Sequence, residues 1–125
     1  MANQLIAFTL VASGSTDLSG VGFNPNDLEF FAAAKNGSAA QLSVVQGQVD
    51  SAGNQFAKQD YYGPTNYNQS STNTRAFKVL EHNGSTWVTV LEFTFTTYLT
   101  DGFRINVNTY NSGSAYQVRG KSRLN

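Results

Sequence analysis

The feature that most constrains this fold is how often turn-forming residues interrupt the sequence. Gly, Asn, Ser or Thr falls inside every window long enough for three helical turns, and these residues favour turns and caps over helix interiors. Only residues 31–35, Phe-Ala-Ala-Ala-Lys, could form a short helix, and Leu28 and Phe30 before them favour a strand. The sequence therefore predicts a chain built from short strands.

Apolar and polar residues alternate in short runs, which recur at intervals of about eight to fourteen residues, as in a sandwich or barrel. A chain of 125 residues fits one domain. We predict an all-β fold, an antiparallel, jelly-roll-like β-sandwich of about eight strands, as a single domain over residues 1–125. The predicted strands cover residues 4–12, 27–34, 40–49, 54–60, 74–81, 86–98, 102–109 and 114–120.

Two of these segments have distinct patterns. Segment 86–98 is apolar on both sides, which predicts a central strand covered on both faces or a strand at a subunit interface. Within it, we expect Glu92 to pair with Arg104 or with a cation across an interface. Segment 102–109 alternates strictly, which predicts a half-buried strand whose packed side consists of Phe103, Ile105, Val107 and Thr109.

The predicted connections contain residues suited to tight turns. Asn36-Gly37, Asn83-Gly84 and Asp101-Gly102 tolerate positive φ, as two-residue hairpin turns require. The pattern favours a hairpin most strongly at Asn83-Gly84, which separates two apolar runs. Residues 61–73 show no periodicity, and we predict one long loop there.

Composition excludes several classes of function. Eight Lys and Arg balance eight Asp and Glu, so the net charge is zero, which argues against nucleic-acid binding. No apolar run approaches the roughly 20 residues of a membrane helix, so we expect no membrane partner. Residues 1–4 lack Lys and Arg, which argues against a secretory signal and predicts folding in the cytosol. Charged residues make up only 13% of the chain, and such weak self-repulsion favours association in an assembly.

Two glycine-phenylalanine turns, far apart in the chain, carry a resemblance to a known family. The segments GVGFNP followed by LEFF, and DGFRINVNT followed by SAYQVRG, resemble a small domain of structural proteins from tailed bacteriophages. The resemblance covers both ends of the chain and does not extend to residues 37–75. It implies a β-sandwich used as a virion building block, often a trimer. The positions that match the family pattern are fold residues: Gly20, Gly22, Phe23, Pro25, Asp101, Gly102, Phe103 and Tyr116.

The best candidate recognition surface lies in the predicted 61–73 loop. Tyrosine rings offer a large contact area at low entropy cost, and neighbouring amides can hydrogen-bond to a sugar or a backbone. The candidate residues are Tyr61, Tyr62, Asn66 and Tyr67. Subunit contact and glycan binding both fit this loop, and so does a purely structural role in which it folds over one end of the sandwich.

The C-terminal stretch is a candidate for capsid docking. Arg119, Lys121 and Arg123 gather three of the eight cations within five residues, and they could steer the chain onto an acidic shell. The alternative is a frayed, solvated tail.

No motif in the sequence predicts chemistry. His82 is the only histidine, there is no cysteine, and the carboxylates are dispersed. We therefore expect a solvated turn residue at His82, no catalytic residue, no metal and no cofactor. A glycosidase needs only two facing carboxylates, so it remains a third alternative.

The sequence-based hypothesis is a non-enzymatic protein of a phage virion, made in the host cytoplasm. It would decorate or cement the head by binding the major capsid protein or other virion proteins, as a homotrimer. The absence of a shaft or coiled coil beside this domain favours the head. The alternative is a tail-fibre or tail-tip module that binds host-surface carbohydrate, with Tyr61, Tyr62 and Tyr67 as stacking platforms.

Overall fold

The computed structural model describes residues 2–10, 12–35, 42–63, 67–82, 85–111 and 117–125. These residues form ten strands. In chain order the strands are β1 (Ala2–Thr9), β2 (Gly14–Leu18), β3 (Asp27–Lys35), β4 (Leu42–Val49), β5 (Gln55–Tyr62), β6 (Tyr67–Thr72), β7 (Phe77–His82), β8 (Trp87–Leu99), β9 (Gly102–Tyr110) and β10 (Gln117–Leu124).

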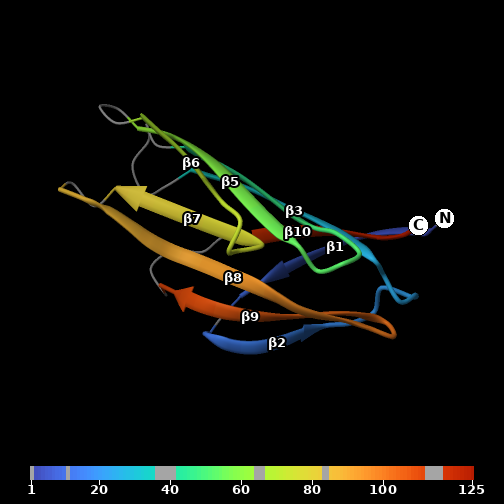
Figure 1. The fold of residues 1–125 in the computed structure, drawn as a ribbon. Coiled ribbons are helices and arrows are strands. Elements are labelled where there is room, and N and C mark those ends of the chain that lie inside the picture. The colour runs from blue at the N-terminus through green and yellow to red at the C-terminus, as the bar shows by residue number, and fades with distance from the viewer. Residues whose placement is uncertain (1, 11, 36–41, 64–66, 83–84, 112–116) are drawn as a thin grey trace.

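The strands form two antiparallel sheets that pack face to face (Figure 1). The six-stranded sheet has the order β1-β10-β3-β4-β5-β6, and the four-stranded sheet has the order β2-β9-β8-β7. The predicted all-β sandwich is therefore confirmed, with ten strands in place of about eight. Residues 31–35 continue β3, as Leu28 and Phe30 suggested, and form no helix.

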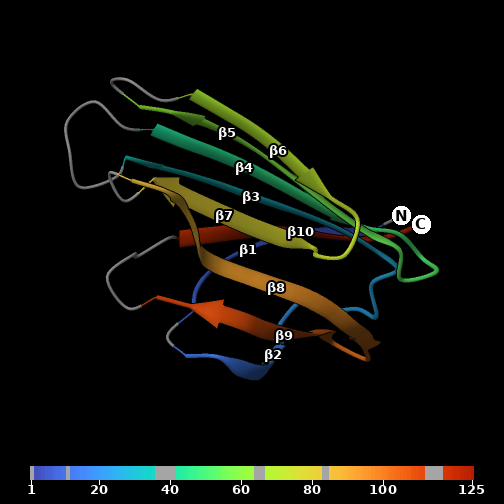
Figure 2. The ribbon, with the colours of Figure 1, turned by 60° about the vertical axis from the view of Figure 1, so that its left-hand side comes forward.

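The two ends of the chain are interleaved, as in a jelly roll. β1 and β3 lie in the six-stranded sheet, and both pair with β10. β2 lies between them in the sequence but belongs to the four-stranded sheet, where it pairs with β9. The N- and C-terminal strands consequently lie side by side, which both views show (Figures 1 and 2).

The core between the sheets is largely aromatic. Phe30 of the six-stranded sheet contacts Phe93 of the other sheet edge-on, with ring centroids 5.0 Å apart. Phe77 stacks on Phe93 at 5.1 Å, and Phe103 lies 5.5 Å from Phe30. All four rings are fully buried. Because fully burying each such side chain contributes about 1.5–3 kcal/mol, this cluster is a main source of the attraction between the sheets.

The expected alternation holds along β9 until a bulge changes it. Phe103, Ile105 and Val107 are buried, as predicted. Val107 pairs with Phe93 and Thr109 pairs with Glu92, so one extra residue of β9 lies between these two pairs. The bulge reverses which side chains face the core. The prediction that Thr109 packs inside was therefore wrong, and its hydroxyl donates to Glu92 at 3.1 Å.

Two strands were missed by the sequence patterns. Residues 61–73 were predicted to be a loop, but β5 extends to Tyr62 and residues 67–72 form β6. The first strand ends at Thr9, before the predicted limit, and a separate β2 follows it. β2 and β6 are edge strands, and each pairs with one neighbour only. Because backbone pairing holds them in the sheet, they need little apolar alternation, and the sequence pattern did not show them.

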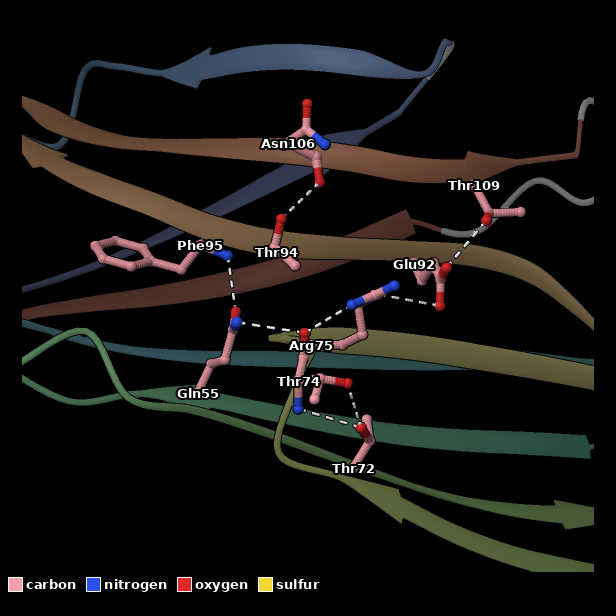
Figure 3. Close-up of polar contacts among 9 residues, drawn as sticks. All are labelled: Gln55, Thr72, Thr74, Arg75, Glu92, Thr94, Phe95, Asn106 and Thr109. Atoms are coloured by element: carbon pink, nitrogen blue, oxygen red, sulfur yellow. Dashed lines mark hydrogen bonds and ion pairs between the residues drawn. The ribbon is translucent and has the colours of Figure 1, made fainter.

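Glutamines from β5 close the β7 side of the four-stranded sheet. Gln59 is 3% exposed, and its amide accepts from the Leu80 N–H at 2.7 Å and donates to the Leu80 carbonyl at 2.8 Å. Gln55 accepts from the N–H of Phe95 at 2.9 Å, beyond the point where β7 pairs with β8 (Figure 3). The backbone groups that β7 and β8 leave unpaired here are thus satisfied by the opposite sheet.

Candidate functional site

The outer face of the six-stranded sheet collects the exposed apolar side chains. Six large apolar side chains are exposed among the described residues. The sixth, Leu124, ends β10, whereas the alternation of each strand places the other five on this one face: Leu5, Val44, Phe56, Tyr62 and Tyr67. Single exposed apolar residues need no explanation, but five of the six on one sheet face distinguish this face from the rest of the described surface.

A straight row of side chains crosses the middle of this face. Arg119 of β10 lies opposite Phe31 of β3, Phe31 lies opposite Gln46 of β4, and Gln46 lies opposite Lys58 of β5. We call these four residues the cross-strand row. Neighbouring strands are about 4.8 Å apart, so the backbones of Arg119 and Lys58 are separated by about 14 Å.

Two shallow hollows adjoin the cross-strand row. One has a volume of about 230 Å³ and is lined by Phe56, Gln48 and Glu29, and the other has a volume of about 360 Å³ and is lined by Val44 and Gln117. Both hollows share Phe31 and Gln46 as a common wall. Lys58 lies in the first hollow and Arg119 in the second, so each hollow has one cation.

The charges on this face are only partly paired. Arg123 bonds to Glu29 at 2.7 Å and to Asp27 at 3.1 Å, and these carboxylates raise the pKa of its guanidinium, Glu29 contributing most. The other two members of the predicted docking stretch, Arg119 and Lys121, form no ion pair with any described residue. The same holds for Lys58 within the described part of the chain.

The C-terminal stretch is therefore not a frayed tail. Arg119, Lys121 and Arg123 belong to β10, which pairs with β1 on one side and β3 on the other. The structure places the three cations on one sheet face and gives Arg123 a structural role, since its ion pairs join β10 to β3.

The predicted tyrosine cluster is divided between the core and the surface. Tyr61 is 1% exposed and contacts Trp87 edge-on at 4.8 Å, so its proposed role as a surface platform was wrong. Burial raises the pKa of its hydroxyl. Tyr62 and Tyr67 are cross-strand partners on the surface, 46% and 59% exposed, with rings 5.2 Å apart. Asn66 lies outside the described residues.

The two glycine-phenylalanine turns meet in space. The Asp101 carboxylate accepts hydrogen bonds from the N–H groups of Gly20, at 3.0 Å, and of Gly22, and the Val21 N–H donates to the Asp101 carbonyl. Both glycines have positive φ, +85° and +91°, a conformation that other residues adopt rarely.

The other described turn residues lie at close backbone contacts or are at least partly buried. A Cβ on Gly102 would lie 1.8 Å from the Leu18 carbonyl oxygen, so the backbones of β9 and the end of β2 approach too closely for a side chain. Pro25 is buried, Phe23 is half-buried and Phe103 is in the core. Tyr116 lies outside the described residues. The described positions among them stabilise the fold through burial and close backbone contacts.

Two ion pairs lie on the four-stranded sheet, whereas Lys78 of β7 forms no ion pair with any described residue. Arg104 forms a bidentate pair with Asp17, at 2.6 and 3.0 Å, and this hydrogen bonding lowers the pKa of the Asp17 carboxyl. Glu92 pairs with Arg75 at 3.3 Å (Figure 3). The prediction that Glu92 would pair with Arg104 was therefore wrong, because β2 places Asp17 directly opposite Arg104.

Groups that could support catalysis or a metal are sparse. His82 ends β7, half-buried, with its ring 5.0 Å from Trp87, so it is not the solvated turn residue that was expected. Within the described ranges, no three His, Cys, Asp or Glu side chains gather closely enough to hold a metal ion. The described part of the chain also has no helix that is long and apolar enough to cross a membrane.

Comparison with protein-family models, with curated proteins and with solved structures finds no match to this chain.

Proposed function

We propose that this chain is a non-enzymatic structural module of a phage virion that binds other subunits through the two edges of its six-stranded sheet. In this proposal it decorates the head and contacts the major capsid protein. The sequence resemblance supports the phage assignment. The observation that carries the binding mode is the composition of the edge strands β1 and β6.

The two edge strands of the six-stranded sheet, as described, contain none of the residues that usually block pairing. β1 reads ANQLIAFT and β6 reads YNQSST, without a charge, a proline or a glycine. Soluble proteins commonly block exposed edges with charges, proline or bulges, since an unblocked edge offers free backbone N–H and C=O groups to another chain. Leu5 and Tyr67, 57% and 59% exposed, lie on these two edges and would be covered in such a contact.

The direction of the strands suits head-to-tail assembly. All neighbours in the six-stranded sheet are antiparallel, so β1 and β6 run in opposite directions. Pairing β1 of one copy with β6 of the next therefore continues the antiparallel sheet. Such a contact joins two different surfaces, and it closes into a ring when the rotation between copies permits. A homotrimer is the proposed ring.

The mass of the protein in solution tests this contact. We expect Leu5→Glu and Gln69→Lys, which put a charge on β1 and on β6, each to give single chains where the unmodified protein forms oligomers. Ser15→Glu is the matched control, because it adds a charge to β2, an edge that already carries Asp17. Sedimentation over a range of concentrations would refute the contact if the unmodified chain were always single, or if both edge variants kept its mass.

The virion role has a separate test. We expect purified particles to contain the chain in their heads and to lose heat and osmotic resistance without it. Particles without it in the head, or equally resistant when it is removed, would contradict the decoration role while leaving the edge contact standing.

A second candidate is a tail-appendage module that binds host-surface carbohydrate. The exposed Tyr62–Tyr67 pair favours it, since such rings can stack on sugar faces. Selective binding on a glycan array that Tyr67→Ala abolishes would support this candidate, and the absence of any binding would oppose it.

A further inference from the structure

We infer that the cross-strand row binds an acidic oligosaccharide that lies across the strands of the six-stranded sheet. This inference rests on the glycan binding of the second candidate function and names the class of ligand, but it places the ligand on the cross-strand row and not on the Tyr62–Tyr67 pair. The site lies on the interior strands β10, β3, β4 and β5, so strand pairing at the two edges does not use it.

The geometry provides an extended site. Arg119 and Lys58 stand at opposite ends of the row, about 14 Å apart along the direction perpendicular to the strands. Two adjoining hollows of about 230 and 360 Å³ lie between and beside them. Two connected hollows suit an oligomer better than a single ring.

The lining combines the three kinds of contact that an acidic sugar chain uses. Phe56, 42% exposed, and the half-buried Phe31 offer ring surface for stacking. The exposed amides of Gln46 and Gln48 can both donate to and accept from hydroxyl groups. The cations at the two ends, which form no ion pair among the described residues, can bond to carboxylate or sulfate groups.

The acidic side chain in the first hollow does not oppose this ligand. Glu29 is bonded to Arg123 at 2.7 Å, so its negative charge is offset by a neighbour on β10. Lys58, which has no ion pair within the described part of the chain, can attract an anion, and the charge of the row is complementary to that of an acidic glycan.

The backbone of the site favours a saccharide over a peptide. β10, β3, β4 and β5 are interior strands, whose N–H and C=O groups are engaged with strands on both sides. An extended peptide gains its affinity chiefly by adding to a free sheet edge. The row offers only side chains, and ring faces, amides and cations are the groups that bind sugars of this class.

The test begins with an array that carries uronate, sialate and sulfated oligosaccharides beside their neutral parents. We expect at least one acidic glycan to bind better than its neutral parent, and the strongest is then titrated with variants. Lys58→Gln and Arg119→Gln should each weaken binding about tenfold, the effect of a charged hydrogen bond. Phe56→Ala should weaken it about fivefold through lost stacking.

Arg104→Gln is the matched control, because it removes the same charge from the outer face of the other sheet, and it should leave the affinity unchanged. Circular dichroism and solution mass confirm that each variant keeps the fold. Preference for neutral glycans, equal displacement by polyglutamate of the same charge, or undiminished binding by both cation variants would overturn the inference. If Tyr67→Ala abolished glycan binding and the row variants retained it, the inference alone would be overturned. If the protein bound no glycan at all, the second candidate function would be overturned as well.

Discussion

The two sheets of this sandwich face the solvent in different ways. On the four-stranded sheet, Arg104 pairs with Asp17 and Arg75 with Glu92, while Lys78 has no ion pair among the described residues. Gln59 also satisfies both backbone groups of Leu80 in β7. On the six-stranded sheet, two edge strands are uncharged, and Arg119 and Lys58 have no ion pair among the described residues.

This difference is the reason for proposing that partners bind the six-stranded sheet. Charges paired within a sheet are compensated before any partner arrives, and a blocked edge cannot accept another strand. A sheet with open edges, exposed rings and cations that have no ion pair among the described residues has groups available to contact a partner. The contrast between the sheets is thus the physical basis for assigning binding to one of them.

The largest loss of stability is expected at Gly47, where β4 approaches the chain that enters β7. In Gly47→Ala, the new Cβ would lie 1.7 Å from the Ala76 carbonyl oxygen, on the chain that enters β7. Backbone must move to accommodate it, and we expect a loss of about 3 kcal/mol in the free energy of unfolding. Denaturant unfolding provides the measurement.

Gly120→Ala is the comparison for that variant. Its Cβ would meet only the rings of Phe30 and Phe8, at 3.3 and 3.4 Å, so the loss should be clearly smaller. Equal losses in the two variants would show that the approach of Ala76 to β4 is not the constraint at Gly47.

A smaller loss of stability is expected when the hydrogen bonds between Gln59 and β7 are removed. Gln59→Leu leaves the N–H and carbonyl of Leu80 without their partners, which should cost about 2 kcal/mol. The variant should also self-associate more strongly, because β7 becomes a third open edge. Unfolding curves and sedimentation measure the two effects, and a variant that matched the parent in both would show that Gln59 does not close this edge.

The smallest effect concerns the exposed ion pair. The Asp17 pKa lies below its ordinary value of 3.8 through its hydrogen bond to Arg104, so the pair stabilises the fold above that value. This contribution is lost as pH falls through the lowered pKa. Arg104→Gln should therefore be slightly less stable than the parent at neutral pH and equal to it in acid.

Arg119→Gln provides the contrast for the unpaired charges. It should match the parent across the same pH range, since Arg119 has no ion pair among the described residues to lose. Thermal unfolding from pH 2 to 7 compares both variants. A pH-dependent loss in Arg119→Gln would indicate that Arg119 forms an ion pair that stabilises the fold, as Arg104 does.

The fold class was predictable because burial of one face of a strand produces a regular alternation of apolar and polar residues in the sequence. Phe103, Ile105 and Val107 alternate with polar residues, and a half-buried strand is the only element that fits them. β2 and β6 lack this pattern because they are edges with few apolar contacts, and their backbone pairing does not show in side-chain order. The bulge that turns Thr109 outward could not be predicted either, because it is a feature of backbone pairing that the order of side chains does not show.

The candidate sites were less predictable, since they depend on strand order. The cations of β10 and the alternating tyrosines were visible as residues, but alternation within β5 sends Tyr61 inward and Tyr62 outward. The cross-strand row exists only because β10, β3, β4 and β5 are neighbours in that order. The contact of Asp101 with Gly20 joins residues 81 positions apart, and local turn chemistry does not specify that partner.

Amide hydrogen exchange at several protein concentrations tests most directly whether the six-stranded sheet associates through its edges. The account predicts that the amides of β1 and β6 become more protected as concentration rises, while those of β7 do not change. Exchange in β1 and β6 that is independent of concentration, from dilute to concentrated solution, would contradict it.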